Sequence, residues 1–236
     1  MNITKYLEHV DKEAKEIFSK TIQDSASFGK AHFLSTCLFE FSQSIQDLNE
    51  QEMLRTVCSQ LESGMINLAY GLYRQAFASL RLAFEMCLGA VHFSIHKMEH
   101  FEWIHGKADI KWAKLIDSEN GVLSKRFANA FFPELSEIMP SYNDRAGKAY
   151  RELSEFVHGN SQTWLKSGIV LKYNDTLKGH YFSLLKEVGE IILIVISCRY
   201  LKYFKKEAFE SMDFLATELN HIDPIREFLG GPKQIR

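Results

Sequence analysis

The stretch LYRQAFASLRLAFEMCLGAVHFSI, residues 72–95, decides the fold class of this chain. Its large apolar side chains recur at intervals of three and four residues, which is the spacing of one face of an α-helix. Proline is scarce in the whole sequence, with four residues in all, so long helices can run uninterrupted. The spacing predicts a helix from about Leu72 to Lys97, with an apolar face made of Tyr73, Phe77, Leu80, Phe84, Leu88, Val91 and Ile95.

The same periodicity extends to both sides of this helix. It predicts an N-terminal helix over 3–22, further helices over 31–48, 53–65, 145–158 and 180–208, and short helices within 101–144. We expect a break at DSASFG (24–29) and a hairpin or an extended loop at 168–179. No internal repeat is visible, and the length suits one large domain.

The expected architecture is therefore an all-α helical bundle, folded as a single domain over 1–236. It consists of an N-terminal helix (1–28), an up-and-down core (30–210) with peripheral helices and an irregular insertion, and a helical tail (211–236).

Composition excludes several classes of protein. Hydrophobic residues make up 46% of the 236 residues and the net charge is −2, which argues against disorder and against a non-specific coat for nucleic acid or membranes. The longest apolar run, residues 191–198, is far shorter than the roughly 20 residues of a membrane span. No secretory signal is visible, and the four cysteines stand singly in helical patterns. We expect a cytoplasmic protein with reduced thiols and no membrane partner.

The stretch AYRELSEFVHGNS, residues 149–161, carries the strongest functional candidates. Arg151 and His158 are seven residues apart, so on a helix they lie about 20° from the same face and roughly 10 Å apart along the axis. Ser154 and Glu155 lie between them on or near that face. Together the guanidinium and the imidazole would form a small anion site suited to one phosphodiester. The alternative is that both side chains are simply solvated.

The residues after the histidine predict where this helix ends. Gly159 and Asn160 are typical of a helix C-terminus, where glycine takes a left-handed conformation. His158 would then lie in the last turn, where the helix dipole favours a positive charge.

The motif YRELSEFVHGN, at the end of a helix in an all-α bundle, resembles the signature of the HEPN superfamily. Active members of that superfamily carry Arg, four to six residues, and then His. Residues 71–94 resemble the "LR…E" helix of bacterial HEPN-like proteins linked to phage defence and abortive infection, with Arg81 and Glu85 as the matching residues. The resemblance covers about residues 30–210. Two features depart from the pattern: Glu152 stands where Asn, His or Asp often follows the arginine, and no partner domain is fused.

The resemblance implies a metal-independent, toxin-like endoribonuclease of antiviral defence. It would act on RNA as a homodimer, with the two motif helices facing each other across one cleft, and without a cofactor or a metal. A neutralising antitoxin or a regulatory partner would restrain it. Arg151 and His158 would be catalytic, and the supporting cleft residues would be Tyr150, Ser154, Glu155, Asn160, Arg81 and Glu85.

Two features of this assignment stay open. The same bundle is also compatible with a non-catalytic interaction module that binds a partner protein or a nucleotide in its cleft. The pair formed by Arg81 and Glu85 has an i, i+4 spacing, which favours a structural ion pair over a wall of the cleft.

A rival motif lies in HFSIHKMEHFEWIH, residues 92–105. Its HKMEH segment (96–100) matches the H-x-x-E-H pattern of inverzincin metalloproteases, with Glu99 as the base. Histidines four residues apart, such as His92 and His96 or His96 and His100, can also chelate a metal from one helix face. That protease fold is much larger and is built around sheets, and no acidic third ligand is recognisable downstream. The sequence therefore favours a polar, histidine-rich helix end, and structural metal binding is the alternative.

Overall fold

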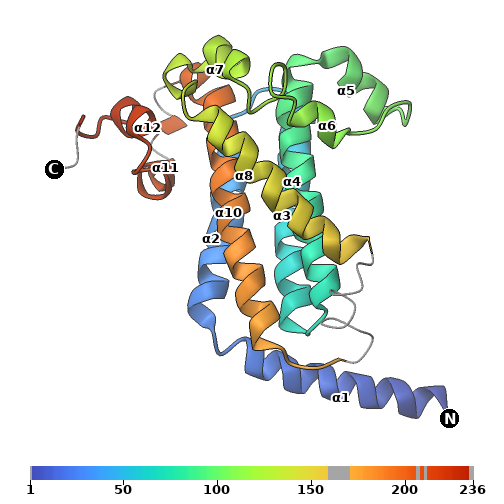
Figure 1. Ribbon diagram of the computed structural model, residues 1–236. Helices are drawn as coiled ribbons and strands as arrows, with labels where there is room; N and C mark the ends of the chain where they lie inside the picture. Colours follow the sequence, from blue (N-terminus) through green and yellow to red (C-terminus); the bar gives the residue numbers. More distant parts are fainter. Residues whose placement is uncertain (1, 159–170, 206–207, 210–211, 234–236) are drawn as a thin grey trace.

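The computed structural model describes residues 2–158, 171–205, 208–209 and 212–233, and these residues form a bundle of α-helices (Figure 1). No strand occurs within these ranges, which confirms the predicted all-α class. Helices α2 (Ser25–Gln43), α3 (Leu48–Ala69) and α4 (Tyr73–Ile95) run up, down and up. Helix α10 (Asp175–Tyr200) stands beside them, and α8 (Met139–Val157) crosses one face, packing on α4 and α10.

Capping side chains determine several helix boundaries. The carboxylate of Asp24 accepts a hydrogen bond from the backbone N–H of Ser27, so most of the expected DSASFG break is the first turn of α2. The side-chain oxygen of Asn174 accepts from the N–H of Leu177 and starts α10 at Asp175. The expectation of a hairpin or loop up to residue 179 was therefore wrong for residues 175–179. The expected helix end at 208 was wrong too, because α10 ends at Tyr200.

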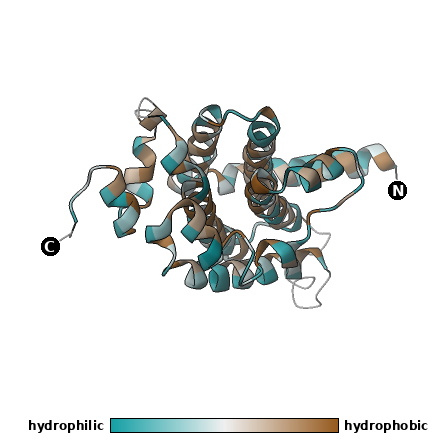
Figure 2. Cartoon of the chain, turned by 90° about the horizontal axis from the view of Figure 1, so that it is seen from above, coloured by the Kyte–Doolittle hydropathy of each residue, from teal (hydrophilic) through white to brown (hydrophobic). Residues whose placement is uncertain are grey.

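The core of the bundle lies between α4, α10 and their neighbours. Figure 2 shows hydrophobic residues turned toward the interior between the helices. Residues 191–198 of α10 are all buried. Among the described residues α4 is the one helix long and apolar enough to cross a membrane, and 72% of its apolar window is buried in the bundle. The four cysteines are buried and unpaired.

Shorter helices fill the irregular insertion between α4 and α8 and the C-terminal tail. The insertion contains α5 (Lys97–Ile104), α6 (Trp112–Leu115) and α7 (Lys125–Phe131), and the tail contains α11 (Asp213–Glu218) and α12 (Asp223–Phe228). Helix α1 (Ile3–Thr21) lies across the lower end of the bundle and projects beyond it (Figure 1).

Candidate functional site

Helix α8 has a buried inner face and a polar outer face. It begins at Met139, with a proline in its first turn, six residues before the expected start at 145. Its inner face is apolar and buried, as Leu153 and Phe156 illustrate. Five exposed side chains follow one another along α8 at intervals of four, three, four and three residues, so they form a stripe on its outer face. They are Asp144, Lys148, Arg151, Glu155 and His158. The structure therefore places Arg151 and His158 on the same exposed face of one helix, as their spacing predicted.

Both side chains of the motif are free to meet a ligand. In the described part of the chain, neither the Arg151 side chain nor the His158 side chain has a hydrogen bond or an ion pair. His158 is the residue that caps α8, and its backbone N–H donates to the carbonyl of Ser154 at 2.9 Å. The Ser154 hydroxyl donates to the carbonyl of Tyr150 at 2.7 Å, so it is already satisfied within its own helix. Asn160 lies outside the described residues.

The inner side of α8 is held on α4 by a cluster around Tyr150. The ring of Tyr150 stacks on Trp112 with centroids 3.7 Å apart, and the Arg81 guanidinium carbon lies 4.7 Å from its centroid. Arg81 also donates a hydrogen bond to the Tyr150 hydroxyl, which in turn donates to Glu85 at 3.4 Å. Burial, opposed by the hydrogen bond from Arg81, raises the pKa of Tyr150, so it stays protonated.

This cluster supports the structural interpretation of the Arg81–Glu85 pair. The two side chains are about one-fifth exposed, their charged atoms are 3.9 Å apart, and both contact Tyr150. The structure thus gathers Arg81, Glu85 and Tyr150 between α4, α6 and α8. It does not bring them to the exposed stripe that carries Arg151 and His158.

A second set of contacts fixes the last turn of α8. The rings of Phe156 and Phe77 stack with centroids 3.8 Å apart and planes within 9°. Arg74 donates to the carbonyl of Phe156 at 2.6 Å, and His180 of α10 pairs with Glu152 at 3.2 Å. The turn that presents the motif histidine is therefore anchored to both α4 and α10, although no sequence pattern linked these residues to the motif.

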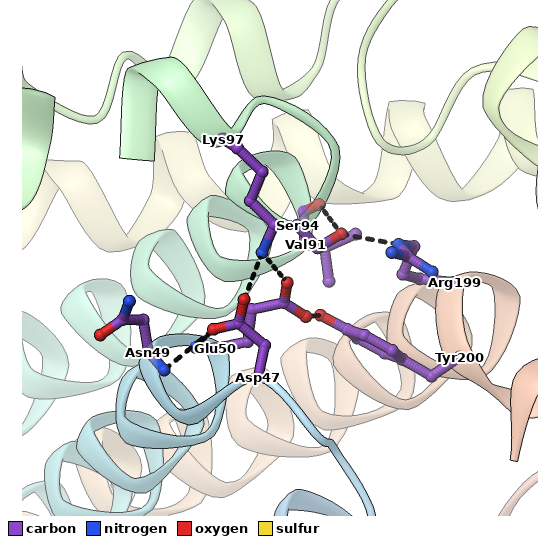
Figure 3. Close-up of polar contacts among 8 residues, drawn as sticks. All are labelled: Asp47, Asn49, Glu50, Val91, Ser94, Lys97, Arg199 and Tyr200. Atoms are coloured by element: carbon purple, nitrogen blue, oxygen red, sulfur yellow. Dashed lines mark hydrogen bonds and ion pairs between the residues drawn. The ribbon is translucent and has the colours of Figure 1, made fainter. Parts of the chain in front are cut away.

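Near the opposite end of α4, a polar cluster surrounds the buried Glu50 carboxylate (Figure 3). The Glu50 carboxylate, 5% exposed, accepts hydrogen bonds from the Tyr200 hydroxyl at 2.7 Å and from the Lys97 ammonium. Lys97 also pairs with Asp47 at 2.7 Å. Desolvation lowers the pKa of Lys97, but the bonds to Asp47 and Glu50 outweigh it and the pKa is raised. Because every charge here has a partner, the cluster is suited to joining α3, α4, α5 and α10.

Three side chains of the histidine-rich motif also come together at this end of α4. Potential ligand atoms of His92, His96 and Glu99 all lie within 4.8 Å of one another. His100 does not join them: its ring is 3% exposed and stacks on Phe93 with centroids 5.1 Å apart. The pair required by the H-x-x-E-H pattern, His96 and His100, is therefore not the pair that the fold brings together.

A groove of about 700 Å³ lies between α2 and α10, away from the polar face of α8. No sequence pattern predicted this groove, because its walls come from distant parts of the chain. Apolar and charged residues both line it, among them Ala31, Leu34, Phe182, Leu185, Lys30, Lys186, Glu190 and His221.

No family model, curated protein or solved structure matches this chain. The functional interpretation therefore rests on the motif residues and on the geometry described above.

Proposed function

We propose that the protein is a metal-independent endoribonuclease of the HEPN type, acting in anti-phage defence as a homodimer, with Arg151 and His158 as its catalytic pair. One observation carries the proposal. Both side chains are exposed on the outer face of α8, while the inner face of the same helix is packed and hydrogen-bonded onto α4 and α10. A rigid support of this kind suits residues that must hold a scissile phosphate in one geometry.

The residue types suit cleavage of RNA through its own 2′-hydroxyl. His158 would accept the proton of that hydroxyl as its oxygen attacks the phosphorus atom. Arg151 would bind the non-bridging oxygens and offset the charge that develops on them. The bond from phosphorus to the 5′-oxygen then breaks and the leaving oxygen takes up a proton. The products are a 2′,3′-cyclic phosphate and a 5′-hydroxyl, and no redox partner or metal is required.

A dimer explains how two residues roughly 10 Å apart along one helix could act on one phosphate. An antiparallel pair of α8 helices, centred between Ser154 and Glu155, places Arg151 of one protomer opposite His158 of the other. It also places the Ser154 hydroxyl of each protomer opposite the Glu155 carboxylate of the other. Arg151 and His158 are exposed on α8, and no described helix packs over them.

The first test compares the wild type with the His158→Ala and Arg151→Ala variants, expressed in a bacterial host and then purified. His32→Ala is a matched control, because His32 is another exposed helix histidine, with 70% of its side chain accessible. Growth, total RNA integrity and the ends of the RNA fragments are measured, with a chelator present in vitro. Losing the general base should slow cleavage by about 10²–10⁴-fold, while the control cleaves like the wild type.

A mixing experiment tests the composite cleft. Neither variant should cleave alone, but dimers formed from a mixture of Arg151→Ala and His158→Ala chains contain one intact site. About one quarter of the wild-type activity should therefore return, since half of the dimers are mixed and each keeps one site of two. Equal cleavage by the wild type and His158→Ala would contradict the catalytic assignment. Absence of cleavage by the wild type would favour the interaction module, with α8 as its binding face.

A further inference from the structure

The junction between α4 and α5 holds a three-residue cluster outside the α8 face. His92 lies in the last turn of α4, His96 is the residue between the two helices, and Glu99 lies in the first turn of α5. The Nε2 atom of His92 is 3.3 Å from Oε2 of Glu99, and the rings of His92 and His96 stack with centroids 4.2 Å apart. Three ligand-type atoms from two helices thus converge on one point.

The His92 side chain is prepared for a ligand. It is 8% exposed, so its ring is held in place by the surrounding bundle. Its Nε2 atom faces the Glu99 carboxylate and is the ring nitrogen available to a metal at this cluster. Burial lowers the pKa of His92, which keeps the ring neutral near pH 7, the form that binds metals.

The ammonium group of Lys114 already lies next to this cluster. The Lys114 ammonium is 3.1 Å from the same Glu99 oxygen that faces His92. Its side chain is about half exposed, so it can swing into water and make room for another cation. Hydrogen bonds from Lys114 and His92 overcome desolvation and lower the pKa of Glu99, so the carboxylate is charged at neutral pH.

We propose that His92, His96 and Glu99 form a binding site for a divalent transition metal, with Zn²⁺ as the preferred ion. Two imidazoles and one carboxylate are a ligand set that suits zinc, and three protein ligands leave a fourth position for water. The ion would connect α4 to α5 and fix the angle at their junction. Along α4, His92 is seven residues, about 10 Å, from Glu85, which contacts Tyr150 on the inner side of α8. It is 18 residues, about 27 Å, from Arg74, which contacts the last turn of α8. The metal site is therefore distinct from the proposed ribonuclease site.

The test titrates the purified, metal-free full chain with Co²⁺, followed by visible absorption, and then displaces Co²⁺ with Zn²⁺. His96→Ala and Glu99→Gln remove ligands whose side chains are not in the core. His105→Ala is the matched control, since it alters a histidine of the same segment that is exposed and outside the cluster. Lys114→Met removes the competing cation and keeps the apolar part of the side chain.

We expect one equivalent of Co²⁺ to bind, and Zn²⁺ to displace it and raise the melting temperature. Changes around a metal's ligands typically cost about 10–100-fold in affinity, so loss of a direct ligand should cost at least about 100-fold. His105→Ala should bind like the wild type, and Lys114→Met should bind more tightly. The proposal is overturned if the wild type does not bind Co²⁺, or if His96→Ala and Glu99→Gln bind as tightly as the wild type.

Discussion

Replacing Lys97 with methionine removes the ammonium group from the buried Glu50 carboxylate and keeps most of the apolar length of the side chain. A matched control exists in Lys125, which pairs with Glu137 at 2.8 Å. The two lysines are equally exposed, at 53% and 50% of the side chain, but Glu50 is 5% exposed and Glu137 is 81% exposed. The main difference is therefore the burial of the carboxylate, and Lys97→Met also breaks the pair with Asp47, whose side chain is 38% exposed.

The two substitutions should differ in their effect on the free energy of unfolding. Breaking a fully buried ion pair by removing one partner costs roughly 3–5 kcal/mol, because the remaining charge is left without compensation. The cost for Lys97→Met should be smaller, about 2–3 kcal/mol, since water reaches the lysine and Tyr200 still donates to Glu50. Lys125→Met breaks an exposed pair, which should cost about 0–0.5 kcal/mol.

Urea denaturation at pH 7, followed by circular dichroism, gives both values. The double variant Glu50→Gln with Lys97→Met should be more stable than Lys97→Met alone, because a neutral amide can still accept from Tyr200 without leaving a buried charge. The reasoning is refuted if Lys97→Met falls within 0.5 kcal/mol of Lys125→Met, a difference of about the error of such measurements. Failure of the double variant to recover stability would refute it as well.

Three further predictions concern α10 and its contacts. Hydrogen bonds from Arg145 and Tyr142 outweigh desolvation and lower the pKa of Glu190 to about 2, below its ordinary value of 4.5. Its contribution to stability is therefore present above pH 4.5 and lost as the pH falls toward 2, so Glu190→Gln should flatten acid unfolding in this range. The Tyr181 hydroxyl is buried without a partner in the described part of the chain, and Tyr181→Phe should stabilise by about 1 kcal/mol. A Cβ at Gly64 would collide with that hydroxyl, so Gly64→Ala should cost about 1–3 kcal/mol in urea denaturation, and less in the Tyr181→Phe background.

Apolar periodicity predicted helices such as α3 and α8 because each of them buries an apolar face, and burial is what the pattern records. The helix boundaries were harder to predict, because a single capping side chain can decide where a helix begins. Asn174 followed by Asp175 was a usable signal for the start of α10, as a capping residue before an acidic first turn. The Arg81–Tyr150–Glu85 cluster could not be predicted, because it joins residues 65 or more positions apart through the packing of α8 on α4.

The candidate sites could be predicted from residue spacing only where the helix is regular. The shared face of Arg151 and His158 followed from their spacing, because α8 is regular between them. The H-x-x-E-H pattern pointed to the wrong pair, because α4 ends at His96, whose backbone dihedrals (φ −116°, ψ 65°) are not helical. The break changes the register, so that His100 turns into the core and His92 faces His96. No proline or glycine marks this break in the sequence.

Helix α4 connects the two proposed sites, which makes their independence testable. The sites share no described residue. Along α4, His92 lies about 10 Å from Glu85, which contacts Tyr150, and about 27 Å from Arg74, which contacts the last turn of α8. Their substitutions should therefore act additively. His158→Ala should leave Co²⁺ binding unchanged, and His96→Ala and chelation should leave RNA cleavage unchanged. If His96→Ala altered cleavage while the fold and the dimer persisted, two elements could carry the coupling. Helix α4 packs on both α8 and α5. Helix α6 contacts Tyr150 through Trp112 and Glu99 through Lys114.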